Sequence, residues 1–462
     1  MADADAQVEA GAGRGMKLHT KIGIGLIAGA VAGVAANSIL GPASPTVMWL
    51  NEYVAGPVGQ IFLRLLFMIV IPLVFASIAL GVASLGDLRR IGRIGGKTLG
   101  YFAVTTALAA TLGLILVSIV RPGERIPPDV RASLMATYAT DASSKVEAAA
   151  TSEFGIQTVV NIVTRNPFKS AVDLDLLGII FFGIMFGVAL TMIASERARP
   201  MIAVLQALND VVIKIVEIAM RLAPYGVAAL IFGVTSRFGF EVVTLLGWYV
   251  AVVLGGLAFH LFVNISALVR LFSGLSPVVF FSRSRSALLT AFSTSSSSAT
   301  LPTSIAVAQS NLGIPKQLAG FVFPLGSTLC MHGTALFEGV TIVTLAQAFG
   351  VDLNLGQMVV VMIMCVVTAI GAAGVPGGSI PLLVGLLTMF GIPAEGIAIV
   401  LGVDRILDMA RTSVNVCGDF SAAVIIGRSE GVWSPASVPA VEGGVETAAP
   451  LDDSPGWPKP EI

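Results

Sequence analysis

The sequence predicts an all-α integral membrane protein, and two observations support this. Of its 462 residues, 55% are hydrophobic and only 12% are charged, with a mean hydropathy of +0.89, whereas about a quarter of the residues in a soluble domain are charged. A helix needs roughly 20 apolar residues to cross a bilayer. Stretches of about this length recur near 22–40, 56–84, 98–120, 177–194, 222–236, 243–269, 318–348 and 396–427.

Charge and cysteine content argue against several other classes of protein. The net charge of -1 shows no basic excess of the kind that nucleic-acid binding requires. The three cysteines, Cys330, Cys365 and Cys417, lack the spacing of a zinc site or a disulfide framework. We therefore expect no nucleic-acid partner and no cofactor.

Basic residues predict which loops face the cytoplasm, because short cytoplasmic loops are enriched in lysine and arginine. Such residues follow the second, fourth and sixth apolar stretches: Arg89, Arg90, Arg93 and Lys97, then Arg197 and Arg199, then Arg283 and Arg285. Both termini are accordingly expected in the cytoplasm, and the segment from 121 to 169 outside.

The two ends of the chain are expected to be disordered tails, at 1–15 and 429–462. Arg14, Lys17 and Lys21 precede the first apolar stretch, as in a signal peptide, and Ala35-Ala36 lies near a suitable cleavage site. Because so many further apolar stretches follow, we expect an uncleaved first helix.

Two polar or Gly/Pro-rich segments interrupt apolar sequence in the second half of the chain. The first is a hydroxyl cluster from Ser293 to Thr300, and the second runs from Gly371 to Ser379 and contains Pro376. Unsatisfied backbone groups are costly in lipid, so each segment is expected to be the tip of a re-entrant helical hairpin. A Ser-rich linker and a bent spanning helix are the respective alternatives. Each hairpin is followed by one apolar segment with polar residues, which suggests an inverted repeat.

Those two following segments carry the remaining polar residues. Gly326 to Thr334, with His332, has the composition of an unwound helix centre. Farther on, five polar side chains recur at spacings of four, three, four and four, which places them within an arc of about 80° on a helix: Asp404, Asp408, Arg411, Asn415 and Asp419. Each charge would cost at least about 2.5 to 3.5 kcal/mol in lipid, so this stripe should face protein, water or ligand.

The chemistry of the stripe suits an acidic amino acid. The arginine fork can bind a carboxylate through two hydrogen bonds. One aspartate can hold an ammonium group, and a deeper aspartate can coordinate a cation. The residues therefore favour a cation-coupled carrier of small acidic solutes.

Three motifs resemble the dicarboxylate/amino acid:cation symporter family, which includes excitatory amino-acid transporters and archaeal aspartate transporters. They are Ser295-Ser296-Ser297-Ser298-Ala299-Thr300-Leu301-Pro302, Gly374-Val375-Pro376-Gly377-Gly378, and the run from Asp404 to Asp419, Asp-Arg-Ile-Leu-Asp-Met-Ala-Arg-Thr-Ser-Val-Asn-Val-Cys-Gly-Asp. The resemblance covers nearly the whole chain outside its tails.

This resemblance implies eight transmembrane helices with two re-entrant hairpins, assembled as a homotrimer that works by an elevator mechanism. Scaffold and trimerisation helices would occupy mainly 16–97 and 158–240. The transport domain would occupy mainly 98–121 and 241–428, with hairpins near 276–315 and 356–396. The second hairpin would be the extracellular gate.

The resemblance also implies roles for individual residues. Arg411 with Thr334 would bind the side-chain carboxylate, Asp408 the amino group with backbone help from Ser295 and Val375, and Asn415 with Ser297 the main-chain carboxylate. The full expected substrate set is Ser295, Ser296, Ser297, Thr334, Val375, Ser379, Asp408, Arg411, Thr412 and Asn415. Sodium ions would be held by Asp419, by carbonyls of Gly326, Cys330 and Asn415, and at a second site near Thr328, Ile370 and Ala372.

The chain departs from the family at one sodium site. The usual Asn-Met-Asp-Gly-Thr stands here as Cys330-Met331-His332-Gly333-Thr334, and Phe102 replaces a tyrosine near Thr105 and Thr106. We therefore expect this site to be absent and fewer sodium ions to be coupled. His332 could carry a proton, since an unperturbed histidine titrates near 6.5, or act as a fixed charge. Separately, neither Ser295 nor Met409 is the arginine that the family often has at one of these positions, which leaves exchange kinetics open.

Three other functions are alternatives to an acidic amino-acid symporter. A hydrolase using Ser297, His332 and Asp408 lacks a G-x-S-x-G elbow and gives Arg411 no role. An ion channel could also use broken helices. A C4-dicarboxylate:cation symporter is the nearest alternative, and Asp408 argues against it because such carriers tend to lack an acid there.

Overall fold

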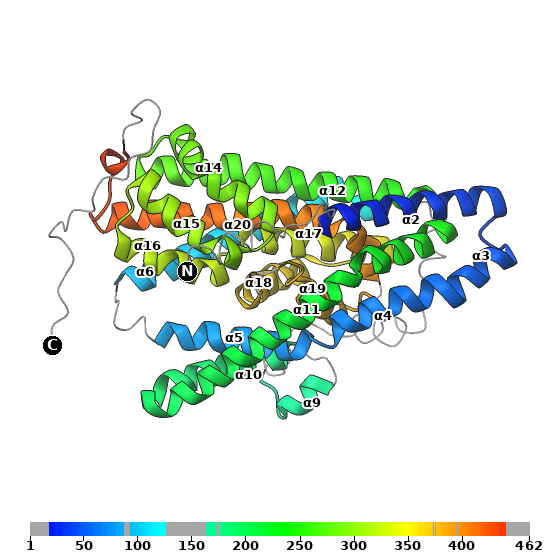
Figure 1. The fold of residues 1–462 in the computed structure, drawn as a ribbon, viewed down its shortest axis with the longest axis horizontal. Coiled ribbons are helices and arrows are strands. Elements are labelled where there is room, and N and C mark those ends of the chain that lie inside the picture. The colour runs from blue at the N-terminus through cyan, green and yellow to red at the C-terminus, as the bar shows by residue number, and fades with distance from the viewer. Residues whose placement is uncertain are drawn as a thin grey trace, which may run out of the picture.

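A computed structural model describes residues 18–86, 93–125, 163–172, 176–372, 374, 376–393 and 396–439. This part of the chain is helical and contains no strand, as the predicted all-α fold class requires. Most helices run close to the long axis of the molecule (Figure 1).

The amino-terminal half supplies one group of helices: α2 (Leu18–Leu40), α3 (Pro45–Leu50), the π-helical turn η1 (Asn51–Ala55), α4 (Gly56–Phe67), α5 (Val70–Gly86), α9 (Pro167–Val172), α10 (Leu176–Met192) and α11 (Ser195–Phe238). Helix α2 packs along α11, and α10 packs along α5. Gly25 and Gly29 allow the first contact, because a Cβ at either position would collide with the carbonyl oxygens of Pro224 and Ala228. Small residues permit such close packing of membrane helices.

The second group contains α6 (Arg93–Val120), the short η3 (Pro122–Arg125), and α12 (Glu241–Phe259), which continues through η4 (His260–Ile265), α13 (Ser266–Leu268) and η5 (Val269–Ser273). It continues with α14 (Pro277–Thr294), α15 (Ser297–Leu312), α16 (Lys316–Leu329), α17 (His332–Phe349), α18 (Leu355–Gly371), α19 (Ile380–Met389), α20 (Ile397–Ser429) and η7 (Pro435–Ser437). Helix α20 contacts α12, α14, α16 and α17, so it lies at the centre of this group.

Five helical segments in the described residues are long and apolar enough to cross a membrane: Thr20–Leu40, Arg93–Arg125, Ser195–Phe238, Glu241–Ser273 and Lys316–Phe349. They include the predicted stretches near 22–40, 98–120, 222–236, 243–269 and 318–348. The predicted stretch near 56–84 is divided between α4 and α5. The chain is a multi-pass membrane protein by this criterion.

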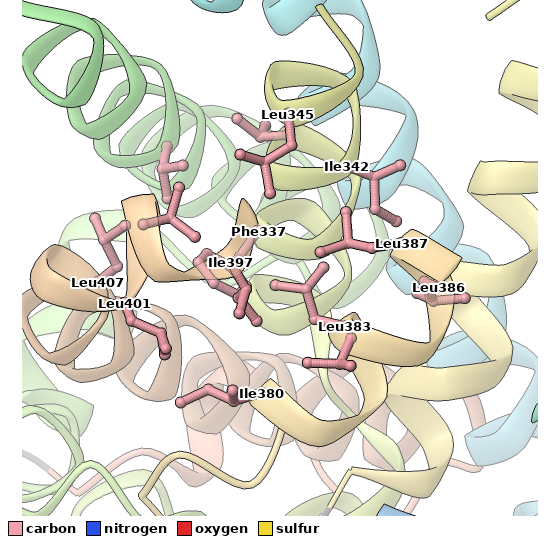
Figure 2. Close-up of a cluster of buried hydrophobic side chains, with 14 of the residues drawn as sticks. Phe337, Ile342, Leu345, Ile380, Leu383, Leu386, Leu387, Ile397, Leu401 and Leu407 are labelled. Atoms are coloured by element: carbon pink, nitrogen blue, oxygen red, sulfur yellow. The ribbon is translucent and has the colours of Figure 1, made fainter. Parts of the chain in front are cut away.

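One hydrophobic core contains side chains from α17, α19 and α20. Figure 2 shows Leu383, Leu386 and Leu387 of α19 facing Phe337 and Ile342 of α17, with further side chains from α20 beside them. All five of these side chains are almost fully buried. This core positions the segment before α19, which reaches the functional site.

The ordered chain extends beyond residue 429, where the carboxy-terminal tail was expected to begin. Trp433 is 2% exposed, and its indole N–H donates to the carbonyl oxygen of Leu312 at 2.7 Å. Arg283 of α14 donates to the carbonyl oxygen of Pro439. The expectation of a disordered tail is therefore wrong for 430–439, because a buried tryptophan anchors this segment to α14 and α15; the remainder, 440–462, and the amino-terminal tail at 1–15 lie outside the described residues.

Candidate functional site

The apolar stretch from 318 to 348 is interrupted where sequence analysis expected an unwound centre. Helix α16 ends at Leu329 and α17 begins at His332. Between them, Cys330 and Met331 have the non-helical conformations φ -96°, ψ 80° and φ -115°, ψ 49°. The unwound part is shorter than the predicted Gly326 to Thr334.

The first polar cluster forms the turn between two packed helices, α14 and α15. Ser295 ends α14 in the left-handed region with φ 51°, a conformation that costs a non-glycine residue about 1–2 kcal/mol. Ser296 then caps α15, where its Oγ accepts from the N–H of Ala299 at 3.1 Å. The chain thus reverses within the serine cluster, as predicted for a hairpin tip.

The second tip lies between α18 and α19 and contacts the first tip directly. The carbonyl oxygen of Gly374 accepts from the Ser296 hydroxyl at 2.6 Å and from the Ser298 N–H at 3.2 Å. Gly377, with φ 75°, donates its N–H to Asp408 Oδ2 at 3.1 Å. Three hydrogen bonds therefore hold the second tip against the first tip and α20.

The predicted stripe on α20 is buried. Asp404, Asp408, Arg411, Asn415 and Asp419 are all 5% exposed or less. Arg411 donates from Nε and Nη2 to Asp408 Oδ1 at 3.1 and 2.8 Å. Its Nη1 lies 3.1 Å from Asp404 Oδ1, so one guanidinium joins two carboxylates.

A small cavity of about 20 Å³ lies between the two tips and α20, with room for about one water molecule. It is lined by seven of the predicted substrate residues, Ser295, Ser297, Thr334, Ser379, Asp408, Thr412 and Asn415, together with Met331, Ala372 and Gly374. The hydroxyl oxygens of Ser295 and Ser379 are buried and have no hydrogen-bond partner among the described residues. Because such groups are costly unless they are paired, they are suited to a polar ligand.

Two other predicted substrate residues, Ser296 and Arg411, do not line this cavity. Ser296 bonds to Gly374 instead. Arg411 is held behind Asp408 by the ion pairs, with its guanidinium carbon 4.0 Å from the centre of the Phe337 ring. Val375 lies outside the described residues.

Asn415 ties α20 to the unwound segment. Its Oδ1 accepts from the Gly333 N–H at 2.7 Å, and its Nδ2 donates to Thr334 Oγ1 at 3.2 Å. The amide is therefore already hydrogen-bonded within the protein on both its oxygen and its nitrogen. A substrate carboxylate would have to replace one of these contacts.

Asp419 has the surroundings expected of a cation ligand. It is 2% exposed; among the described residues its Oδ1 has no hydrogen-bond partner, and the Cys330 thiol interacts with the carboxylate. This oxygen lies against Gly326, where a Cβ would collide with it. A buried carboxylate oxygen without a partner fits a cation, because an isolated buried charge is otherwise very unfavourable.

The other predicted cation ligands lie on different elements of the fold. Cys330 lies beside Asp419's helix, with its Sγ 3.7 Å from the Asn415 carbonyl oxygen. Ala372, the residue that follows α18, lines the small cavity. Ile370 belongs to the last turn of α18. Thr328 donates its hydroxyl hydrogen to the Leu325 carbonyl within α16.

His332 lies in the pocket where the sequence departs from its family. Its Nε2 is 2.7 Å from Thr105 Oγ1 and 3.3 Å from Cys330 Sγ. The ring of Phe102 lies nearby, against Gly326. The structure thus brings Thr105 of α6 beside Cys330 and His332, which both lie far from it in sequence.

Three further polar residues lie near the site, two of them fully buried and one partly buried, and none was predicted as a site residue from the sequence. Glu338 of α17 is fully buried, and its Oε2 accepts from Thr368 Oγ1 at 2.7 Å while Oε1 has no partner. His260 is also fully buried and lies 3.4 Å from His332. Arg405 places Nη1 3.7 Å from Asp408 Oδ2. Their charge or polarity inside apolar stretches was the available signal, because such residues in membrane helices usually mark functional sites.

Comparison with known proteins agrees with this geometry. A model of the sodium:dicarboxylate symporter family matches residues 18–429. A proton/sodium-glutamate symport protein of Geobacillus stearothermophilus is 36% identical over 428 residues, which are 91% of this chain and 96% of the relative. A proton/glutamate-aspartate symporter of Escherichia coli is 35% identical over 402 residues, or 87% of this chain and 91% of the relative. A C4-dicarboxylate transport protein of Bacillus subtilis is 31% identical over 390 residues, or 84% and 90%.

These matches cover the serine cluster, the segment between α18 and α19, the unwound segment and the stripe of α20 together. The family and these relatives are transporters, which confirms that the chain is a transporter and not a hydrolase. Because the family model spans almost all of the described residues, the chain belongs to the sodium:dicarboxylate symporter family.

Proposed function

We propose that the chain is a secondary active symporter that imports aspartate or glutamate together with sodium. The observation that carries this proposal is the buried arrangement of Arg411 between Asp404 and Asp408 beside a hydroxyl-lined cavity. It provides one group for a carboxylate and one for an ammonium. The names of two relatives, a glutamate symporter and a glutamate-aspartate symporter, point to the same substrate class.

Substrate binding would exchange partners within this ion-pair group. Arg411 would turn its Nε and Nη2 from Asp408 to the side-chain carboxylate of the substrate, while keeping Asp404 at Nη1. Asp408 would then accept the ammonium group. A solute without an ammonium would leave Asp408 without this partner, which favours amino acids over C4-dicarboxylates.

The second hairpin would act as the gate. The present cavity of about 20 Å³ is far too small for an amino acid, so the tips must separate before a substrate enters. The contacts to be broken are those from Gly374 to the first tip and from Gly377 to Asp408. An ammonium that binds Asp408 would compete with the Gly377 contact and would thereby link binding to movement of the gate.

The architecture proposed with this function follows the family. We propose eight transmembrane helices and two re-entrant hairpins, cytoplasmic termini, and a homotrimer in which the second group of helices moves as an elevator against α2, α4, α5, α10 and α11. The hairpin pairs α14/α15 and α18/α19 each precede a long helix with buried polar residues. That order supports an inverted repeat.

Sodium would bind at Asp419, whose buried Oδ1 has no hydrogen-bond partner in the part of the chain that the structure describes. A second sodium would bind among carbonyls near Thr328, Ile370 and Ala372. A coupled proton would be carried by His332 or Glu338, the latter being a fully buried carboxyl with one neutral hydrogen-bond donor. The printed names of two relatives include protons as coupling ions.

Uptake of labelled aspartate into proteoliposomes tests substrate and coupling together. Inward sodium and proton gradients of equal size are applied separately, and unlabelled succinate is added as a competitor. Accumulation driven by sodium supports the site at Asp419, whereas accumulation driven by protons alone assigns coupling to His332 or Glu338. Failure to accumulate aspartate under both gradients, with succinate taken up instead, would replace this proposal with a dicarboxylate carrier.

The matched variant for this assay is Asp408→Asn, which keeps the size of the side chain and removes its charge. We expect it to lose aspartate uptake. Wild-type uptake by this variant would contradict the role given to Asp408 as the ammonium partner.

A further inference from the structure

A chain of buried hydrogen bonds connects α12 and its π-helical extension to the pocket that contains His332. Asn264 Nδ2 lies 3.2 Å from His260 Nδ1, and His260 Nε2 lies 3.4 Å from His332 Nδ1. His332 Nε2 lies 2.7 Å from Thr105 Oγ1. The two imidazoles are fully buried and meet edge to face at 86°.

Thr105 determines the direction of this chain. Its Oγ1 lies 2.6 Å from the Tyr101 carbonyl oxygen and 3.3 Å from that of Phe102, and both can only accept. The hydroxyl hydrogen therefore points to a carbonyl, and the lone pairs of Oγ1 face His332. His332 must then donate from Nε2.

The remaining hydrogen positions follow in sequence. A neutral imidazole has one N–H, so a proton on Nε2 of His332 makes its Nδ1 an acceptor. His260 must then donate from its own Nε2, which leaves its Nδ1 to accept from the Asn264 amide. Each of the three side-chain contacts, from Asn264 through His260 and His332 to Thr105, pairs one donor with one acceptor between neutral side chains in this arrangement.

Two local features hold the rings in place. Gly418 of α20 provides room, because a Cβ there would be 2.7 Å from Cε1 and 2.9 Å from Nδ1 of His332. His260 and Asn264 both lie in the π-helical turn η4, and such turns are often found at functional sites. The π-helical turn therefore carries both residues that orient His332.

We propose that His260 and Asn264 are positioning residues that hold the Nε2–H of His332 in the pocket between Thr105 and Cys330, so that a fixed hydrogen-bond donor occupies the place of a cation. A cation there would need lone pairs directed at it, and it would meet the N–H hydrogen. This inference rests on the proposed symport function, gives a physical reason for a smaller number of coupled sodium ions, and leaves Glu338 rather than His332 as the carrier of a coupled proton.

Nitrogen-15 NMR of histidine-labelled protein tests the arrangement directly. The chain contains only three histidines, and His19→Gln allows the two buried ones to be assigned. The two neutral tautomers interchange which ring nitrogen gives the protonated signal. We expect both buried rings to be neutral and protonated on Nε2, and the Nε2–H signal of His332 to persist when sodium replaces choline.

Asn264→Asp tests whether orientation is passed along the chain. A carboxylate accepts from His260 Nδ1–H, so a neutral His260 would accept at Nε2 and His332 should switch to Nδ1–H, with the Thr105 hydroxyl turning from the Tyr101 carbonyl to donate to His332 Nε2. The switch is a specific test because, among the described residues, Asn264 is connected to His332 through His260. A purely structural defect at Asn264 would not change the tautomer of His332. In Asn264→Asp combined with His260→Leu, the chain is interrupted and His332 should return to Nε2–H.

Several results would overturn this inference. They are a wild-type His332 that is protonated on Nδ1 or on both nitrogens, loss of its Nε2–H signal in sodium, or a His332 tautomer that is unchanged in Asn264→Asp. The wild-type spectrum gives an answer even if neither variant folds. Absence of aspartate uptake would contradict the proposed function and would leave the tautomer result unchanged, so the two failures are distinguishable.

Discussion

Replacing Arg411 with lysine keeps the positive charge of the site and removes the planar fork. In the structure, Arg411 makes two hydrogen bonds to Asp408 and an ion pair with Asp404 on another edge of the guanidinium. A lysine ammonium is a compact charge that lacks this fork. The ammonium can take either Asp404 or the substrate carboxylate as a close partner, but it cannot hold both in the geometry that the guanidinium provides.

The expected loss follows from the bonds that lysine cannot make. A hydrogen bond to a charged group contributes about 1.5–3 kcal/mol, and each 1.4 kcal/mol is about tenfold in affinity. Loss of one such bond in the bound state predicts a KM for aspartate that is about 10-fold to 100-fold higher. Arg411→Ala is a poorer test, because it leaves Asp404 and Asp408 buried without their shared cation, at a cost of about 3–5 kcal/mol in folding.

The assay is sodium-driven uptake of labelled aspartate over a range of concentrations, with thermal unfolding measured on the same protein preparations. Arg428→Lys is the matched control, since Arg428 lies on the same helix and is exposed. We expect the control to transport as wild type does. A folded Arg411→Lys protein whose KM for aspartate stays within about twofold of wild type, far below the predicted change, would refute the reasoning.

Three further perturbations test other parts of the structure. Asp419→Asn removes the charge of a buried carboxylate whose Oδ1 has no hydrogen-bond partner among the described residues. We expect the sodium concentration for half-maximal uptake to rise about tenfold or more, equivalent to at least about 1.4 kcal/mol, whereas Asp352→Asn, at an exposed position, should have no effect. Equal sodium curves for wild type and Asp419→Asn would remove Asp419 from the cation site. Gly374→Ala places a Cβ 2.8 Å from Ser298 Oγ and from the Ser327 carbonyl oxygen, so it should separate the two tips and reduce uptake. Gly320→Ala, whose Cβ meets open space, should transport normally. Full activity of Gly374→Ala would show that close contact between the tips is unnecessary. Hydrogen bonds from Arg93 lower the pKa of Glu430, which follows the last residue of α20. The Glu430 carboxylate therefore stabilises the folded protein above its ordinary pKa, and this stabilisation is lost as the pH falls through the lower pKa that Glu430 has in the folded protein. The unfolding temperature of wild type should consequently fall more steeply than that of Glu430→Gln on acidification, and parallel curves would contradict a stabilising role for this carboxylate.

Some features of the site were predictable because their signal is local. The serine cluster indicated a chain reversal, and Ser295 does end α14 in a left-handed conformation. The spacing from Asp404 to Asp419 indicated one helical face, and all five side chains are buried on α20. Both inferences depend on the cost of polar groups within an apolar stretch, which needs no knowledge of distant residues.

Other features depend on partners that are distant in sequence. Asn415 was expected to bind a substrate carboxylate, and the fold engages its amide with Gly333 and Thr334. Ser296 was expected at the substrate, and its hydroxyl bonds to Gly374 of the other tip. Periodicity identifies the face on which a residue lies, but the group opposite that face depends on how the helices pack.

The sequence by itself determined the membrane class and the positions of the breaks, and it indicated candidate residues for an acidic solute, because hydropathy, helix-breaking residues and helical spacing are properties of neighbouring residues. Only the tertiary structure decided that Arg411 joins Asp404 to Asp408, that the tips close the cavity, and that His260 contacts His332. Hydrogen bonds and ion pairs are effective over a few ångströms. Which groups come within that range is set by the packing of α12, α17, α18 and α20, and this packing is a property of the folded chain.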